Sequence, residues 1–130
     1  MIVVCASALL EVLLRTPAAR GVERQLFAPD QTLHAPHLLD VEVTQVVRRY
    51  AAIGQIDDQR GRAVLADLAD LPLHRYPHDF LLPRVWRLRD TLTAYDAVYV
   101  ALAEALDAPL LTRDRRLAAA AGHHARIELV

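Results

Sequence analysis

The chain has 130 residues, of which 54% are apolar, so it is long enough to bury one hydrophobic core and too apolar to be disordered. Its formal net charge of −1 excludes a strongly basic protein that is held to nucleic acid by overall charge alone. Its one cysteine, Cys5, excludes an internal disulfide, and we recognise neither an export signal nor a membrane-spanning run, so we expect a single cytoplasmic domain over residues 1–130 without membrane contact.

The first half of the chain alternates apolar runs with amphipathic patterns. In chain order it is predicted to contain a strand over residues 2–5, a helix over 8–14, a helix from 17 to about 25, a strand over 32–35, a helix over 37–53 and a helix from about 57 to 69. Gly54 is suited to end the third helix, and Asp57 is suited to begin the fourth.

The second half continues the same alternation. It is predicted to contain a strand over residues 71–76, a helix over 78–89, a helix over 93–106, a strand over 109–112, a helix over 115–121 and a strand over 126–130. Pro72 favours an edge position for its strand, and Pro83 conflicts with an unbroken helix. Thr93 and Asp96 have the spacing of a capping box. The order of elements predicts a three-layer α/β/α domain with a parallel sheet of about five strands.

Three acidic residues that are far apart in sequence are predicted to share one edge of this sheet with Cys5. Cys5 ends the first strand, and Glu42 lies within two turns of the start of a helix that follows a strand. Asp96 is near the start of the capped helix, and Asp114 separates the strand over 109–112 from the next helix. The carboxyl ends of parallel strands lie at the same edge, where α/β proteins bind their ligands.

Each acid also has a purely local explanation. Asp96 could only complete the capping box, and Asp114 could only cap the last helix. Glu42 could be a solvated helix residue, although its neighbours Val41 and Val46 make a poor solvent-facing surface. Carboxylates that are gathered without lysine repel one another unless a hard divalent cation lies between them, which favours a magnesium or manganese site.

Such a site suits the hydrolysis of phosphodiester bonds, because the cation can polarise a phosphoryl oxygen and activate water. Arg113, Arg115 and Arg116 flank Asp114 and are candidates to bind the backbone of a nucleic-acid substrate. The alternative for each of these arginines is an ordinary solvated charge.

With these residues in view, the chain resembles the PIN-domain ribonucleases, and in particular the VapC toxins of type II toxin–antitoxin pairs. The resemblance lies in four segments, "MIVVCASALLEVLL", "HAPHLLDVEVTQVVRR", "LTAYDAVYVALAEAL" and "LLTRDRRLA". They cover both ends and the middle of the chain and leave residues 55–90 unsupported.

The resemblance implies a small homodimeric endoribonuclease that uses Mg²⁺, or alternatively Mn²⁺, and a cognate VapB-type antitoxin that obstructs its acidic pocket. It also implies a set of catalytic and metal-binding residues with two supporting hydroxyl groups, at Cys5, Glu42, Asp96, Asp114, Ser7 and Thr112.

Cys5 departs from the family pattern, in which this position carries aspartate. The departure removes one hard oxygen ligand, and a thiol is a poor substitute at a magnesium site. Three interpretations remain open at this point. Cys5 is a natural substitution that weakens or abolishes the nuclease, a deliberate change that disarms a toxic enzyme, or a ligand for a softer metal such as zinc.

Two rival functions follow from the same features. A phosphorylation-switched receiver domain has a similar architecture, but it needs paired acids after the first strand and a lysine, and this chain has no lysine. A catalytically inactive PIN-domain binding module, which engages antitoxin or RNA without cleavage, stays open because of Cys5.

Two helices carry more apolar residues than one buried face requires, over residues 9–14 and 97–106. Core burial explains part of this excess, and a dimer or antitoxin surface is the prediction for the remainder. We expect the adjacent His123 and His124 to be solvated in a terminal loop.

Overall fold

A five-stranded sheet, parallel throughout, forms the centre of the computed structural model, which describes residues 1–130. The spatial order of the strands is β3-β2-β1-β4-β5, so the sequence order reverses at β1 and β4. The strands are β1 (Ile2–Val4), β2 (Leu33–Pro36), β3 (Leu73–Tyr76), β4 (Leu110–Thr112) and β5 (Ile127–Leu129). Between β1 and β4, Val3 is paired with Leu110 and Val4 with Leu111.

The three central strands are buried along their whole length, whereas the edge strands β3 and β5 are partly exposed. Helices cover both faces of a parallel sheet, so the central strands meet no solvent on either side. This is why β1 and β4 consist almost entirely of apolar residues. The edge position predicted for the strand after Pro72 is confirmed.

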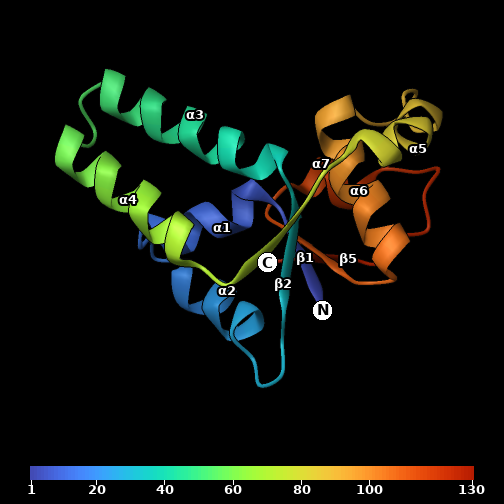
Figure 1. Ribbon diagram of the computed structural model, residues 1–130, viewed down its shortest axis with the longest axis horizontal. Helices are drawn as coiled ribbons and strands as arrows, with labels where there is room; N and C mark the ends of the chain where they lie inside the picture. The colour runs from blue at the N-terminus through green and yellow to red at the C-terminus, as the bar shows by residue number, and fades with distance from the viewer.

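Helices cover both faces of the sheet and make the three layers that the sequence predicted. Helices α1 to α4 lie on one side, with α3 and α4 side by side, and α5 and α6 lie on the other (Figure 1). None of the helices offers an apolar stretch of the length that crossing a bilayer requires. The helices are α1 (Ala6–Leu13), α2 (Ala19–Leu26), α3 (Leu38–Ala52), α4 (Asp58–Asp70), α5 (Leu82–Arg87), α6 (Ala94–Leu106) and α7 (Arg115–Ala119).

Local signals place the helix ends close to their predicted positions. The side chain of Asp57 accepts a hydrogen bond from the backbone N–H of Arg60 at the start of α4, and Thr93 does the same for Asp96 at the start of α6. Gly54 follows α3 with a φ of 78°, a left-handed conformation that glycine adopts without strain.

The helix predicted over residues 78–89 was wrong as a single element. A short 3-10 helix, η1 (Asp79–Leu81), precedes α5, and Pro83 lies in the first turn of α5. Proline is tolerated there because the first N–H groups of a helix have no partner within it. Pro83 is therefore compatible with α5, which begins one residue earlier at Leu82.

Two expectations about apolar surfaces need correction. Val41 is 67% exposed, so the valines around Glu42 do not all face the core. Conversely, every residue of α6 from Ala97 to Ala103 is buried within the chain. Packing inside the domain accounts for this apolar excess, because α6 lies against the sheet, and it supplies no argument for a dimer surface.

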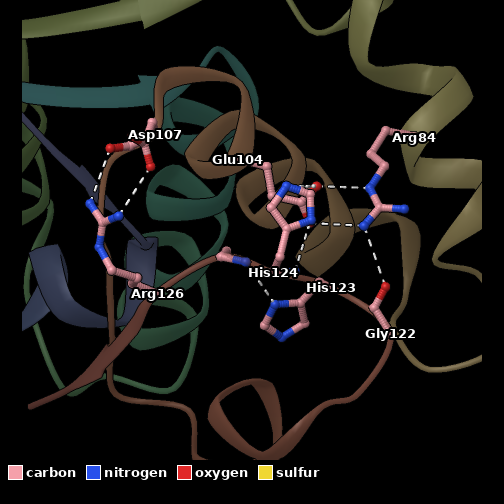
Figure 2. Close-up of polar contacts among 8 residues, drawn as sticks. Arg84, Glu104, Asp107, Gly122, His123, His124 and Arg126 are labelled. Carbon is pink, nitrogen blue, oxygen red and sulfur yellow. Dashed lines mark hydrogen bonds and ion pairs between the residues drawn. The ribbon is translucent and has the colours of Figure 1, made fainter.

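A polar cluster fastens the loop before β5 to α5 and α6 (Figure 2). Arg84 donates from Nε to Glu104 Oε2 at 2.9 Å and from Nη2 to the carbonyl of Gly122 at 3.3 Å, while His124 N–H donates to Glu104 Oε1 at 3.4 Å. His124 is solvated as predicted, whereas His123 is partly buried and its Nδ1 accepts from the N–H of Ala125.

Candidate active site

A small cavity of about 100 Å³ lies where the carboxyl ends of β1 and β4 meet. This is the point at which the strand order reverses, where open α/β sheets place their binding sites. The structure brings together here the residues that the sequence had placed at one edge. The cavity is lined by Cys5, Ser7, Glu42, Asp96, Thr112 and Asp114, among others.

Asp114 is held by the helix that it begins. Its Oδ1 accepts hydrogen bonds from the backbone N–H groups of Arg116 at 2.8 Å and Leu117 at 3.4 Å. Its own N–H donates to the hydroxyl of Thr112 at 3.0 Å. Both the local and the functional interpretation therefore apply to Asp114, because the cap fixes a carboxylate that also lines the cavity.

Asp96 is the third residue of α6, on a backbone that Thr93 fixes. The hydroxyl of Thr93 accepts from the N–H of Asp96 at 3.2 Å. Burial raises the pKa of the Asp96 carboxyl, hydrogen bonding to Thr93 opposes this rise, and the negative charge of Asp114 adds to it. Asp96 and Asp114 are therefore close enough to repel each other.

Glu42 reaches the cavity from α3 and is bound by a residue that the sequence analysis missed. The hydroxyl of Tyr99 donates to Glu42 Oε1 at 2.5 Å. Burial raises the pKa of Glu42, the bond from Tyr99 lowers it, and the charge of Asp96 raises it further. Burial and the same carboxylate raise the pKa of Tyr99, so this hydroxyl stays protonated as a donor.

Two hydroxyl groups join β4 to the first turn of α1. Ser7 Oγ accepts from the N–H of Arg113 at 3.2 Å and lies 3.4 Å from Thr112 Oγ1. Through Thr112, this pair also reaches the N–H of Asp114. Ser7 and Thr112 thus fix the backbone that carries the last acid of the site.

Cys5 lies among the three carboxylates and is only 6% exposed. Burial raises the pKa of its thiol, the hydroxyl of Thr112 opposes this, and the charges of Asp96, Glu42 and Asp114 raise it further. These effects favour the neutral thiol over the thiolate. A nucleophilic role would require the thiolate, which this environment disfavours.

The donor chemistry of the cavity fits a hard cation better than a soft one. Glu42, Asp96 and Asp114 supply oxygen donors, which Mg²⁺ and Mn²⁺ prefer, whereas Cys5 offers only a protonated sulfur. As the side chains stand, no group of three or more His, Cys, Asp or Glu residues is close enough together to hold a metal ion. Binding would require a shift of these side chains, and Glu42 Oε2, which does not accept from Tyr99, stays available for a cation.

The three candidate RNA-binding arginines differ in their freedom. Arg113 donates to the carbonyl of Val130 at 2.7 Å and lies 3.5 Å from a carboxylate oxygen of Glu11. Arg115 and Arg116 are exposed, and their side chains make no ion pair or hydrogen bond within the chain. Arg113 is therefore already partly used in tying the chain terminus to α1.

A larger cavity, of about 640 Å³, opens beside the acidic one, between α1 and α3. Its apolar lining includes Leu10, Leu14 and Val41. Ser7 and Glu42 line both cavities, so the two are neighbours. The predicted excess of apolar residues in the first helix is thus partly explained by this groove.

Sequence comparison places the whole chain in a known family. The family model described as PIN domain matches residues 2–123. Ribonuclease VapC12 of Mycobacterium tuberculosis is 45% identical over 130 residues, covering 100% of this chain and 99% of the relative. Ribonuclease VapC1 of the same organism is 46% identical over 129 residues, with 98% and 96% covered.

Structure comparison agrees on the fold. A toxin–antitoxin complex from Klebsiella pneumoniae contains a chain that matches with a TM-score of 0.66 and 20% identity, covering 92% of this chain and 91% of that one. At that identity the match supports the fold alone, whereas the full-length identity to two curated ribonucleases carries the assignment. The chain therefore belongs to the VapC family of PIN-domain ribonucleases.

Proposed function

We propose that this chain is a metal-dependent endoribonuclease, the toxin of a toxin–antitoxin pair, and that Cys5 weakens its activity. The observation that carries the proposal is the cavity at the carboxyl ends of β1 and β4, where Glu42, Asp96 and Asp114 meet. Relatives that are 45–46% identical over nearly the full chain are ribonucleases by name, which supports RNA as the substrate.

Glu42, Asp96 and Asp114 would hold Mg²⁺ or Mn²⁺ in this cavity. When bound, the cation would polarise a phosphoryl oxygen of RNA and lower the pKa of a water molecule. The chain itself contributes orientation, because the cap of α7 fixes Asp114 and the hydroxyl of Thr112 fixes the backbone before it. The exposed Arg115 and Arg116 are suited to bind the phosphates on either side of the cleaved bond.

Cys5 accounts for the weakening. It occupies the cavity among the three carboxylates, yet its protonated thiol brings neither negative charge nor a hard oxygen ligand. The missing charge lowers the attraction for a divalent cation, and the cation then binds with fewer protein ligands.

The test is to restore the carboxylate. Cys5→Asp is expected to raise the rate of RNA cleavage in Mg²⁺ or Mn²⁺ by about 10- to 100-fold, the range typical of a group that tunes a metal site. Adding Asp96→Ala to Cys5→Asp is expected to abolish the gain. The measurement is cleavage of a labelled structured RNA by purified protein, with EDTA as the blank.

Equal rates for the chain with and without Cys5→Asp would show that position 5 takes no part in binding the metal. Cleavage that persists after Asp96→Ala would contradict the proposed site as a whole. Asp90→Ala is the matched control, because Asp90 is an exposed aspartate that does not line the cavity.

An antitoxin is the proposed protein partner, and a homodimer is the proposed assembly. The resemblance to the VapC toxins of toxin–antitoxin pairs, with 45% identity to ribonuclease VapC12, supports the first of these. An antitoxin that covers the acidic cavity would offer cations to its carboxylates and apolar side chains to the adjoining groove. Sedimentation of the isolated chain at micromolar concentration tests the dimer, and a single monomeric species would contradict it.

The second candidate function is a binding module that no longer cleaves RNA. The specific observation in its favour is the buried thiol of Cys5 in the lining of the cavity, where burial raises its pKa. The same assay separates the two functions. No cleavage by the chain as it stands, together with cleavage after Cys5→Asp, would assign the binding function to the chain that carries Cys5.

A further inference from the structure

We infer that Tyr99 is a positioning residue, which holds the carboxylate of Glu42 in the acidic cavity so that it can bind a cation. This inference rests on the proposed function and deepens it by adding a residue that carries no charge. Tyr99 acts through Glu42 rather than on the metal or the substrate.

The geometry links two helices that come from different parts of the chain. Glu42 lies on α3 and Tyr99 on α6, and the Tyr99 hydroxyl donates to Glu42 Oε1 at 2.5 Å across 57 residues of sequence. Tyr99 is three residues after Asp96, so both side chains leave α6 on the same face. One face of α6 therefore contributes a carboxylate and fixes another.

The two partners differ in their freedom to move. Tyr99 is only 2% exposed, and its ring is enclosed by the core, so its hydroxyl has one position. Glu42 is partly exposed, has three side-chain torsions and follows the exposed Val41. A long flexible carboxylate gains a defined position from a rigid donor, since the donor removes the rotamers that the solvent would allow.

The hydrogen bond from Tyr99 to Glu42, which we call the tether, determines which of two cavities the Glu42 carboxylate faces. Glu42 lines both the acidic cavity and the larger apolar groove between α1 and α3, whereas Tyr99 lines only the acidic one. The hydrogen bond from Tyr99 therefore selects the acidic cavity. Without the hydroxyl, the carboxylate is free to turn toward the groove and water.

The experiment removes the hydroxyl and measures metal binding directly. Tyr99→Phe keeps the ring and deletes only the donor. Titration with Mn²⁺, followed by the electron paramagnetic resonance signal of the free ion, gives the affinity without any need for catalysis. The titration is run on the chain as it stands and on the Cys5→Asp variant.

Tyr99→Phe is expected to weaken Mn²⁺ binding by about five- to tenfold, the loss that corresponds to one hydrogen bond of ordinary strength. In the cleavage assay, the Mn²⁺ concentration for half-maximal rate is expected to rise by the same factor, with the rate at saturating Mn²⁺ changed by less than about twofold. If Tyr99 served only to stabilise the fold, its loss would not raise the half-maximal Mn²⁺ concentration while leaving the rate at saturating Mn²⁺ unchanged.

Tyr76→Phe is the matched control. Tyr76 belongs to the edge strand β3, and its hydroxyl is hydrogen bonded to His34 Nδ1 of β2 at 2.7 Å. Tyr76 does not line the acidic cavity. This variant loses the same atom and one hydrogen bond, so it is expected to lose stability while its Mn²⁺ affinity stays unchanged.

Unchanged Mn²⁺ affinity in Tyr99→Phe would overturn the inference and leave the proposed function standing. Parent chains that bind no Mn²⁺, with or without Cys5→Asp, would overturn both. Should Tyr99→Phe fail to fold, Tyr99→Met replaces it, because methionine also lacks the hydroxyl, adapts to a buried space and leaves Glu42 unchanged. A matching loss of affinity supports the tether, and an unchanged affinity contradicts it.

Discussion

At the scale of single residues, hydroxyl groups rather than charged side chains fix the acids of the cavity. Thr112 accepts from the N–H of Asp114, Thr93 accepts from the N–H of Asp96, and Tyr99 donates to Glu42. A hydroxyl can do this without neutralising a carboxylate, which a lysine or arginine at the same place would do. The cavity therefore keeps its negative charge.

The hydroxyl of Thr112 is expected to be worth more than its small size suggests. The Thr112 side chain is fully buried, and its hydroxyl accepts from the N–H of Asp114. Thr112→Val keeps the shape of the side chain but leaves this N–H without its acceptor. The free energy of unfolding, measured by urea denaturation, is expected to fall by about 1–2 kcal/mol.

Thr44→Val is the control for this prediction. Thr44 donates to the carbonyl of Asp40 on the exposed side of α3, so the same substitution is expected to cost less than about 0.5 kcal/mol. Equal losses at the two positions would show that the bond to Asp114 makes no special contribution.

At the scale of elements, helix starts decide where the acids lie. Asp96 is near the first turn of α6 and Asp114 caps α7, and both helices begin at the same edge of the sheet. The partial positive charge of a helix start favours a carboxylate there, which offsets part of the repulsion between the two acids. The fold thus tolerates a cluster that the side chains alone would disfavour.

Removing the cap of α6 is expected to affect both stability and the site. Thr93→Ala deletes the acceptor for the N–H of Asp96 and should lower the free energy of unfolding by about 1 kcal/mol. Because Asp96 then loses its fixed backbone, the rise in melting temperature on adding Mn²⁺ should also shrink. Differential scanning fluorimetry with and without Mn²⁺ measures both effects.

Asp57→Ala provides the comparison, since Asp57 caps α4 in the same way and does not line the acidic cavity. It should cost a similar free energy while leaving the rise with Mn²⁺ intact. A rise that shrinks equally in both variants would mean that lost stability alone explains the effect of Thr93→Ala.

At the scale of the whole molecule, the last third of the chain is fastened by ion pairs as well as by the core. Glu104 of α6 accepts from Arg84 at 2.9 and 3.0 Å, and Arg84 also binds the carbonyl of Gly122 (Figure 2). Arg126 is paired with Asp107 at 3.0 Å beyond the end of α6. These contacts hold the loop that leads into β5, the strand that pairs with β4.

Glu104 is expected to make stability depend on pH. Burial alone would raise the pKa of this carboxyl, but hydrogen bonding to Arg84 and its positive charge bring the pKa below its usual value near 4.5. The stabilisation is therefore complete above the unfolded-state pKa and is lost as the pH falls through the lower folded-state pKa.

Glu104→Gln should thus be less stable than the parent chain by about 1–3 kcal/mol at pH 7, with the difference shrinking below about pH 4.5. Urea denaturation at several pH values measures the difference. Glu128→Gln is the control, since Glu128 is exposed and makes no ion pair, and it should leave stability unchanged. A gap for Glu104→Gln that does not depend on pH would contradict the role of its charge.

Sequence patterns were sufficient wherever short-range interactions decide the structure. The capping box at Thr93, the Asp57 cap and the buried run before Cys5 each involve only a few consecutive residues. The three acids could be placed at one sheet edge because topology alone relates strand ends to helix starts. Pro83 was a sign that the helix predicted over residues 78–89 is interrupted. The sequence did not show that the interruption comes before Pro83, which lies in the first turn of α5.

Long-range packing decided what the sequence could not. Nothing in the neighbourhood of Tyr99 distinguishes it from an ordinary core aromatic, because its partner Glu42 is 57 residues away. Val41 of α3 is exposed, and residues 97–103 of α6 are all buried. The burial of a helix residue depends on which other elements pack against its helix, and the sequence does not show this.

The sequence by itself thus determined most of the order of strands and helices, the parallel sheet and the placement of three acids and Cys5 at one sheet edge. Only the tertiary structure decided which hydroxyl fixes which carboxylate and how the chain terminus is fastened. The physical reason is range, because caps and periodicity act over a few residues, whereas a side-chain contact between distant segments exists only once the core has set the distance between them.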